Sequence, residues 1–311
     1  MKSGIRQMRM ISSTSIALLV STSVWAQQPK TFSSPEEAAK ALVQAANQPG
    51  LPPLLEIFGA DSKDLFPTDE EGQALRGAFV QAAAKKVQID ADPTHLGRAI
   101  IEVGEKGWPF PVPLMPTKDG RWKFDIEEGR NEVLARRLGA NELAAITVVA
   151  GYVEAQQEYA SIDRNGDGVL EYAQRILSTP GQKDGLYWDG SDSPVAGVIT
   201  KSIADGFQAG TLQAYRGYYF RILKSQGPAA EGGAANYVVK NKWMIGGFAL
   251  LAWPEKYGVT GVRTFIVNYS GVIYEKDLGA STGQLAPAIR SFNPDSSWRV
   301  VFDVDMDESG D

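Results

Sequence analysis

The feature that most constrains the fold is one long helical pattern, which divides the chain in two. Residues 141–160 (NELAAITVVAGYVEAQQEYA) repeat apolar side chains at α-helical spacing. These are Leu143, Ile146, Ala150 and Val153. Asn141 suits the N-cap and Glu142 the first turn, so we expect a helix from Asn141 to Ala160.

The residues before this helix predict a small helix-plus-sheet module. Helical patterns begin near Ser34, at residues 51–58 and near Thr68, each with a capping residue or a proline at its start. Extended patterns follow at residues 98–104, 107–116 and 121–126. We therefore expect an N-terminal α+β module over residues 27–130.

The residues after the long helix are dominated by strand patterns. Residues 215–227 alternate aromatic and polar side chains, and residues 241–254 predict a longer apolar strand in which Gly246 and Gly247 indicate a bulge or a close approach. Residues 261–279 predict a β-hairpin. The fold class is therefore expected to be α+β, with the long helix packed on an antiparallel β meander over residues 131–302 and an acidic tail at 303–311.

The first 26 residues have the pattern of a secretory signal peptide. Lys2, Arg6 and Arg9 precede a short apolar run that ends in Val24-Trp25-Ala26, which predicts cleavage after Ala26. No later run reaches the roughly 18 apolar residues of a transmembrane helix, so no membrane span is expected in the mature chain. We expect a periplasmic protein, and the absence of cysteine excludes a lipoprotein anchor.

Composition excludes several function classes. Cleavage would leave 311 − 26 = 285 residues and, with three basic residues removed, change the formal charge from −6 to about −9. That charge disfavours nucleic acid and anionic lipid as partners. The chain has one histidine, His95, in a turn-like segment. A single histidine excludes multi-histidine zinc sites and allows a Ser–His–Asp triad only if His95 is its base.

The segment 162–172 (IDRNGDGVLEY) follows the long helix directly and resembles half of a calcium-binding loop. Short oxygen-bearing side chains alternate with other residues, and Gly168 stands where such a loop turns sharply. The predicted ligands are Asp163, Asn165, Asp167, the backbone carbonyl of Val169, and Glu171.

This loop is not a complete EF-hand, because its twelfth position is Gln174 and not the usual bidentate glutamate. We therefore expect a Ca²⁺ ion that fastens the connection and sends no signal. The alternatives are a turn whose side chains only cap local amides, and a catalytic metal site, for which no histidine or second carboxylate cluster lies nearby in the sequence.

Other acidic and aromatic residues offer weaker candidates. Glu154 and Glu158 share a helix face, and Asp184 and Asp189 flank the aromatic pair at 187–188. A hydrolase would use two such carboxylates in one cleft, about 5–10 Å apart. A solvated helix face and aromatic packing explain the same residues without chemistry.

Long motifs identify the chain as a member of a known exported family. GWPFPVPL, WKFDIEEGRNEVLARRLGANEL, SIDRNGDGVLEYAQRILSTPGQKDGLYW and GGFALLAWPEKYGVTGVRTFIVNYSGVIYEKDLG resemble a bacterial family known as domain of unknown function 2950. The resemblance covers nearly the whole mature chain and implies export, but no reaction.

The C-terminal half also resembles the globular heads of type IV pilins and pseudopilins, in which strands wrap a long helix and a loop often carries calcium. The chain lacks the prepilin cleavage motif and the apolar assembly helix of those proteins. We expect a non-enzymatic envelope binding or assembly module with no catalytic residues, acting on an unidentified envelope protein or polymer. The alternative is a periplasmic hydrolase with paired carboxylates.

Overall fold

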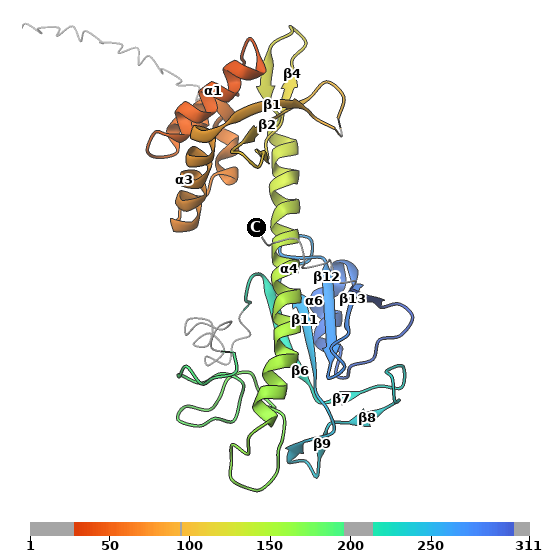
Figure 1. The fold of residues 1–311 in the computed structure, drawn as a ribbon. Helices are drawn as coiled ribbons and strands as arrows, with labels where there is room; N and C mark the ends of the chain where they lie inside the picture. Colours follow the sequence, from red (N-terminus) through yellow and green to blue (C-terminus); the bar gives the residue numbers. More distant parts are fainter. Residues whose placement is uncertain (1–27, 94, 196–213, 302–311) are drawn as a thin grey trace, which may run out of the picture. The chain divides into compact units, whose positions relative to one another are not determined.

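The structure is a computed structural model of the chain and describes residues 28–93, 95–195 and 214–301. The predicted signal peptide (1–26) and acidic tail (303–311) lie outside these residues. Contacts between Cα atoms divide the chain into two compact units, Met1–Arg130 and Asn131–Asp311. Figure 1 shows the helices and strands of both.

The first unit places helices beside a small antiparallel sheet, as the sequence predicts. Its helices are α1 (Pro35–Ala46), α2 (Pro52–Phe58), the short 3₁₀ helix η1 (Ala60–Leu65) and α3 (Glu70–Lys85). Its strands are β1 (Val87–Ala91), β2 (Ala99–Val103), β3 (Trp108–Pro109), β4 (Leu114–Pro116) and β5 (Trp122–Phe124). They lie in the order β1-β2-β4-β5, with β3 on β2.

Sequence signals explain how this unit closes. The Ser34 hydroxyl caps α1 by accepting from the amide of Glu37, and Pro35 occupies the first turn. Strand β2 alternates buried and half-buried residues, as expected of a sheet with one covered face. The core formed between sheet and helices is aromatic and aliphatic, with Phe32, Leu42, Phe58, Ile101, Leu114 and Phe124 at its centre.

The long helix α4 (Ile126–Ala160) has 35 residues and begins 15 residues earlier than predicted. Its start lies at Asp125, whose carboxylate accepts from the amide of Glu128. Asn141 was wrongly expected to be the N-cap; it lies inside the helix, and its side-chain amide donates to the carbonyl of Thr260 (2.9 Å). Residues 130–140 contain many good helix formers, so the helix continues through Gly139 without a break.

The second unit contains a five-stranded antiparallel sheet. Its strands are β6 (Tyr218–Leu223), β11 (Ala249–Pro254), β12 (Arg263–Asn268), β13 (Ile273–Asp277) and β14 (Arg299–Val300). Their order is β14-β13-β12-β11-β6. Strands β12 and β13 form the predicted hairpin, paired from Arg263–Asp277 to Val267–Ile273.

Helices cover both faces of this sheet. Burial, and then the nearby carboxylate of Glu142 on α4, raises the pKa of Tyr218 on β6, whereas Arg221 of β6 donates to backbone carbonyls in and after α6 (Thr282–Ala288). Residues 218 and 221 have opposite parity and so point to opposite faces. Strand β11 lies between the two helices and all six of its residues are buried, which explains its unbroken apolar sequence.

The apolar run at 241–254 forms two strands and not one. Strand β10 (Trp243–Met244) pairs with β9 (Val238–Val239), and β11 begins only at Ala249. Between them, Gly247 has φ +134°, and a Cβ placed on it would lie 2.7 Å from the Tyr269 ring. The predicted close approach at this glycine pair is confirmed, and the pair lies in the break between β10 and β11.

The described part of the second unit also contains three short elements. Strands β7 (Ser225–Gln226) and β8 (Ala235–Asn236) pair with each other, and a 3₁₀ turn, η2 (Gly279–Ser281), leads into α6. Within the described ranges, no helix combines the length and the apolar character needed to cross a bilayer.

Candidate functional site

The loop after α4 is wound around the carboxylate of Asp163. One of its oxygens, Oδ1, accepts from the amide of Gly166 (2.8 Å), and Oδ2 accepts from the amide of Gly168 (2.8 Å). Both glycines have positive φ, +73° and +81°, which the tight turn requires. These amides, that of Gly168 first, hold the pKa of Asp163 below its ordinary value.

Asp167 connects the loop to strand β10. Its Oδ2 accepts from Lys242 Nζ (2.8 Å) and from the indole Nε1 of Trp243 (2.8 Å), while Oδ1 accepts from the amide of Val169 (3.1 Å). The Lys242 ammonium also lies over the Trp243 ring, 4.4 Å from its centroid. The hydrogen bonds from Lys242 and then Trp243 lower the pKa of Asp167 to about 2.

Glu171 returns across the loop to Asn165. The Asn165 Nδ2 donates to Glu171 Oε1 (2.9 Å), and the Asn165 Oδ1 accepts from the amide of Asp167 (3.0 Å). Partial burial raises the pKa of Glu171, and the negative charges of Asp167 and Asp163 raise it further. Three carboxylates of this loop are therefore close enough to repel one another.

The four predicted side-chain ligands thus surround one turn, but they are engaged in hydrogen bonds with amides and with each other. Within the described residues, no group of three or more Asp, Glu, His or Cys side chains lies at metal-ligand spacing. The donor chemistry suits calcium, which prefers carboxylate, amide and carbonyl oxygens. A bound ion would have to draw these oxygens together.

Gln174, the residue at position 12 of the loop, faces the neighbouring strand. Its Nε2 donates to the carbonyl of Lys242, and its Oε1 accepts from Lys224 Nζ (3.0 Å). Together with Asp167, it fastens the loop to β10. Sequence reasoning found the loop but missed Lys242 and Trp243, because no local pattern links residues 75 positions apart.

The remaining sequence candidates do not form a second site. Glu154 and Glu158 are exposed on α4, as expected of a solvated helix face. Asp184 accepts from the amide and hydroxyl of Thr179 and pairs with Arg175 (3.2 Å).

The aromatic pair between these acids is packed into the core. Tyr187 and Trp188 are buried in the hydrophobic cluster of the second unit, which favours packing over a ligand groove. Asp189 is exposed. His95 lies in the exposed turn between β1 and β2, 3.6 Å from Asp92.

Comparison with known proteins gives a family and nothing finer. No curated protein and no solved structure matches the chain, so the resemblance to pilin heads has no support. The model of the family described as protein of unknown function (DUF2950) matches residues 29–301, which is most of the chain and includes the loop at 161–174. The chain therefore belongs to the DUF2950 family.

Proposed function

We propose that this chain is an exported, non-enzymatic binding or assembly module of the bacterial envelope, in which Ca²⁺ fastens the loop after α4. One observation carries the calcium site: the carboxylates of Asp163, Asp167 and Glu171 belong to one loop, and after partial burial the charges of Asp167 and Asp163 further raise the pKa of Glu171. A divalent cation removes this repulsion, and only Lys242 pairs with any of the three within the described residues.

The ligands in this proposal are the five predicted from the sequence. Asp163, Asn165, Asp167 and Glu171 supply side-chain oxygens, and Val169 supplies its carbonyl. Binding exchanges the Asn165–Glu171 hydrogen bond for coordination of both residues to the ion. Position 12 is the neutral Gln174, which is also committed to Lys242 and Lys224, so the site lacks the bidentate acid of tight EF-hands. We expect a Kd of about 10⁻⁴–10⁻³ M, typical of extracellular modules.

The hydrolase alternative has less support. It needs two carboxylates facing one cleft, and the pair on α4, Glu154 and Glu158, is exposed to solvent. Asp184 is held by Arg175 and Thr179. A binding or assembly role does not require these acids to take part in catalysis.

Calcium titration of the purified protein tests the site. At ten times a Kd of 1 mM, calcium should stabilise the second unit by about 1.4 kcal/mol, a melting-temperature rise of about 3–5 °C. Asp163→Asn should abolish this rise. Glu154→Gln, which removes a carboxylate on the exposed face of α4, should leave it unchanged. A melting temperature that ignores calcium would exclude the ion.

Export is tested separately from calcium. Protein recovered from the periplasmic fraction of a Gram-negative host should have the intact mass of a chain that begins at Gln27, as cleavage after Ala26 requires. Recovery of the uncleaved chain in the membrane or cytoplasmic fraction would contradict the proposed location without affecting the calcium result.

A further inference from the structure

The dipeptide Asn165-Gly166, in the loop after α4, is a chemically labile sequence. Asn-Gly occurs once in the chain, and both residues are exposed to solvent. Because glycine has no side chain, its amide nitrogen can approach the side chain of a preceding asparagine with little steric hindrance. An unstructured chain with this pair deamidates spontaneously. Whether the folded loop reacts depends on the hydrogen bonds that these two residues make.

Deamidation begins when the Gly166 amide loses its proton and its nitrogen attacks Cγ of Asn165. The bond between Cγ and Nδ2 breaks, ammonia leaves, and a cyclic imide (a succinimide) remains. Water then opens this ring at either of its carbonyls, which gives aspartate or isoaspartate. The net reaction consumes one water, releases one ammonia and needs no other reactant.

The nucleophile of this reaction is bound to a carboxylate. The Gly166 amide donates to Asp163 Oδ1 (2.8 Å), so its proton lies against a negative charge. Loss of that proton would place a second negative charge beside the carboxylate and forfeit a charge-assisted hydrogen bond. The neighbouring Asp167-Gly168 pair is restrained in the same way, because the Gly168 amide donates to Asp163 Oδ2 (2.8 Å). Asp163 therefore disfavours the deprotonated amide that must attack.

The side chain that would be attacked is also held. Asn165 Oδ1 accepts from the amide of Asp167 (3.0 Å), and Asn165 Nδ2 donates to Glu171 Oε1 (2.9 Å). Both ends of the carboxamide are thus fixed, so rotation of the side chain toward the Gly166 nitrogen would cost these hydrogen bonds. The closed loop therefore restrains both partners of the reaction.

We propose that Asn165 is a latent deamidation site that Asp163 keeps closed, so that the reaction proceeds only while the loop is open. Its products are irreversible. Aspartate at position 165 lacks the Nδ2 donor to Glu171 and adds a fourth carboxylate to the loop, and isoaspartate also lengthens the backbone. Either product would hinder the loop from closing again. The inference uses hydrogen bonds within the loop and does not depend on calcium.

The rate of deamidation in the purified protein tests this inference. Incubation at mildly alkaline pH in EDTA, which removes calcium, followed by peptide mass mapping, measures conversion of Asn165. The folded protein should react at least about tenfold more slowly than the same chain unfolded in guanidinium chloride, because the reaction requires the loss of hydrogen bonds to charged groups. Equal rates in the folded and unfolded chain would overturn the proposal.

Two variants separate the role of Asp163 from general loosening of the loop. Asp163→Ala should accelerate deamidation of Asn165 by about tenfold or more, because it removes the acceptor of the Gly166 amide. Lys242→Met cuts the ion pair that ties the loop to Lys242 but leaves the bond from Gly166 to Asp163 in place, so it should react at close to the original rate. An unchanged rate in folded Asp163→Ala, or equal acceleration by both variants, would overturn the role of Asp163.

Amide hydrogen exchange in the unmodified protein tests the same contact without a substitution. The Gly166 and Gly168 amides should exchange at least about tenfold more slowly than they do in the unfolded chain. Exchange of the Gly166 amide at the unfolded rate would contradict the proposal. Melting curves establish whether Asp163→Ala is folded, and the exchange measurement decides the matter if it is not.

Discussion

The side-chain amide of Gln156 on α4 makes both backbone hydrogen bonds of Ala173. Its Oε1 accepts from the Ala173 amide (2.8 Å), and its Nε2 donates to the Ala173 carbonyl (2.9 Å) and to the hydroxyl of Tyr152 (2.9 Å). Gln156 is fully buried. One side chain near the end of α4 therefore holds the exit of the loop whose entry follows Ala160.

Gln156→Ala should destabilise the second unit by about 2–4 kcal/mol, because it leaves both backbone groups of Ala173 buried without their partner. Denaturant unfolding, followed by tryptophan fluorescence, measures the change. Gln157→Ala removes the same side chain from the exposed face of α4 and should stay within about 0.5 kcal/mol of the original. Equal effects of the two variants would contradict the role assigned to Gln156.

The ion pair at Asp167 should make part of the second unit's stability acid-sensitive. The pKa of Asp167 is lowered from 3.8 to about 2, so the stabilisation is complete above 3.8 and is lost as the pH falls through about 2. Lys242→Met should raise this pKa toward 3.8, so that the acid-dependent loss of stability becomes smaller and is complete at a higher pH. NMR titration of the Asp167 carboxyl carbon measures the shift.

Lys240→Met is the control for this titration. Lys240 lies over the same Trp243 ring, 5.8 Å from its centroid, and the substitution removes the same charge without touching the Asp167 ion pair. It should leave the Asp167 pKa near its original value. A shift as large as that in Lys242→Met would mean that general field effects, and not the direct contact, lower the pKa.

Gly247→Ala should be strongly destabilising, by about 2 kcal/mol or more. The new Cβ would lie 2.7 Å from the Tyr269 ring and 2.9 Å from the Tyr237 ring, at a φ of +134°. Gly271→Ala also has a positive φ, +79°, but its Cβ would meet open space, so it should cost about 1 kcal/mol. The difference between the two melting curves isolates the steric contribution, and identical curves would disprove the close approach.

The sequence predicted the fold wherever periodicity or turn chemistry was strong. The hairpin around Asn268–Gly271, the close approach at Gly247 and the α+β class are confirmed, whereas residues 241–254, expected to be one strand, form two. The predicted start of α4 was wrong because Asn141 and Glu142 are residue types that are common at a helix N-terminus. Their side chains instead bind the backbone of residues 260–263. A residue type cannot show whether its hydrogen-bond partner is local or distant.

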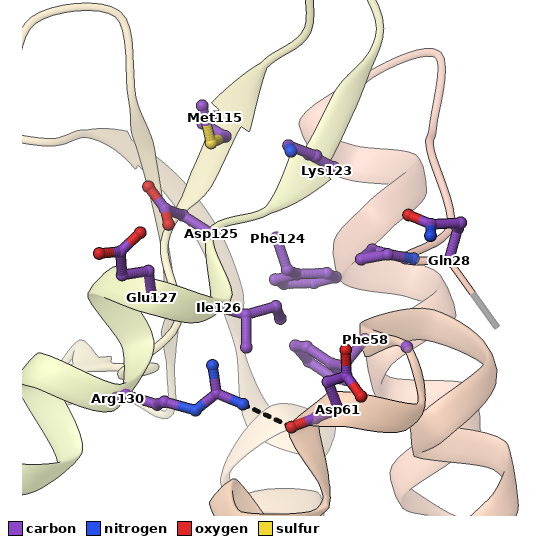
Figure 2. Close-up of a pocket in the computed structure, with 12 residues that line it drawn as sticks. Gln28, Phe58, Asp61, Met115, Lys123, Phe124, Asp125, Ile126, Glu127 and Arg130 are labelled. Carbon is purple, nitrogen blue, oxygen red and sulfur yellow. Dashed lines mark hydrogen bonds between the residues drawn. The ribbon is translucent and has the colours of Figure 1, made fainter. Parts of the chain in front are cut away.

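The candidate site also has a part that the sequence predicts and a part that it does not. The spacing of oxygens from Asp163 to Glu171 is local and visible in the sequence, whereas the partners Lys242, Trp243 and Lys224 reach the loop only through the pairing of strands. A pocket of about 490 Å³ in the first unit, lined in part by Phe58 and Phe124 (Figure 2), could not be predicted either. Its lining comes in part from η1, β4, β5 and α4, and only the folded unit brings these segments together.

Gln174 determines how any ion in this loop can act. Gln174 donates a hydrogen bond to the Lys242 carbonyl, and Asp167 accepts one from the Lys242 ammonium. Because Lys242 directly precedes β10, these bonds join the loop to the start of that strand. The loop of a calcium sensor must change shape when its ion binds and dissociates. This loop could do so on a large scale only by breaking its hydrogen bonds to Lys242, next to strand β10. A cation bound here would add stability to a connection that these two contacts already hold, and would not act as a switch.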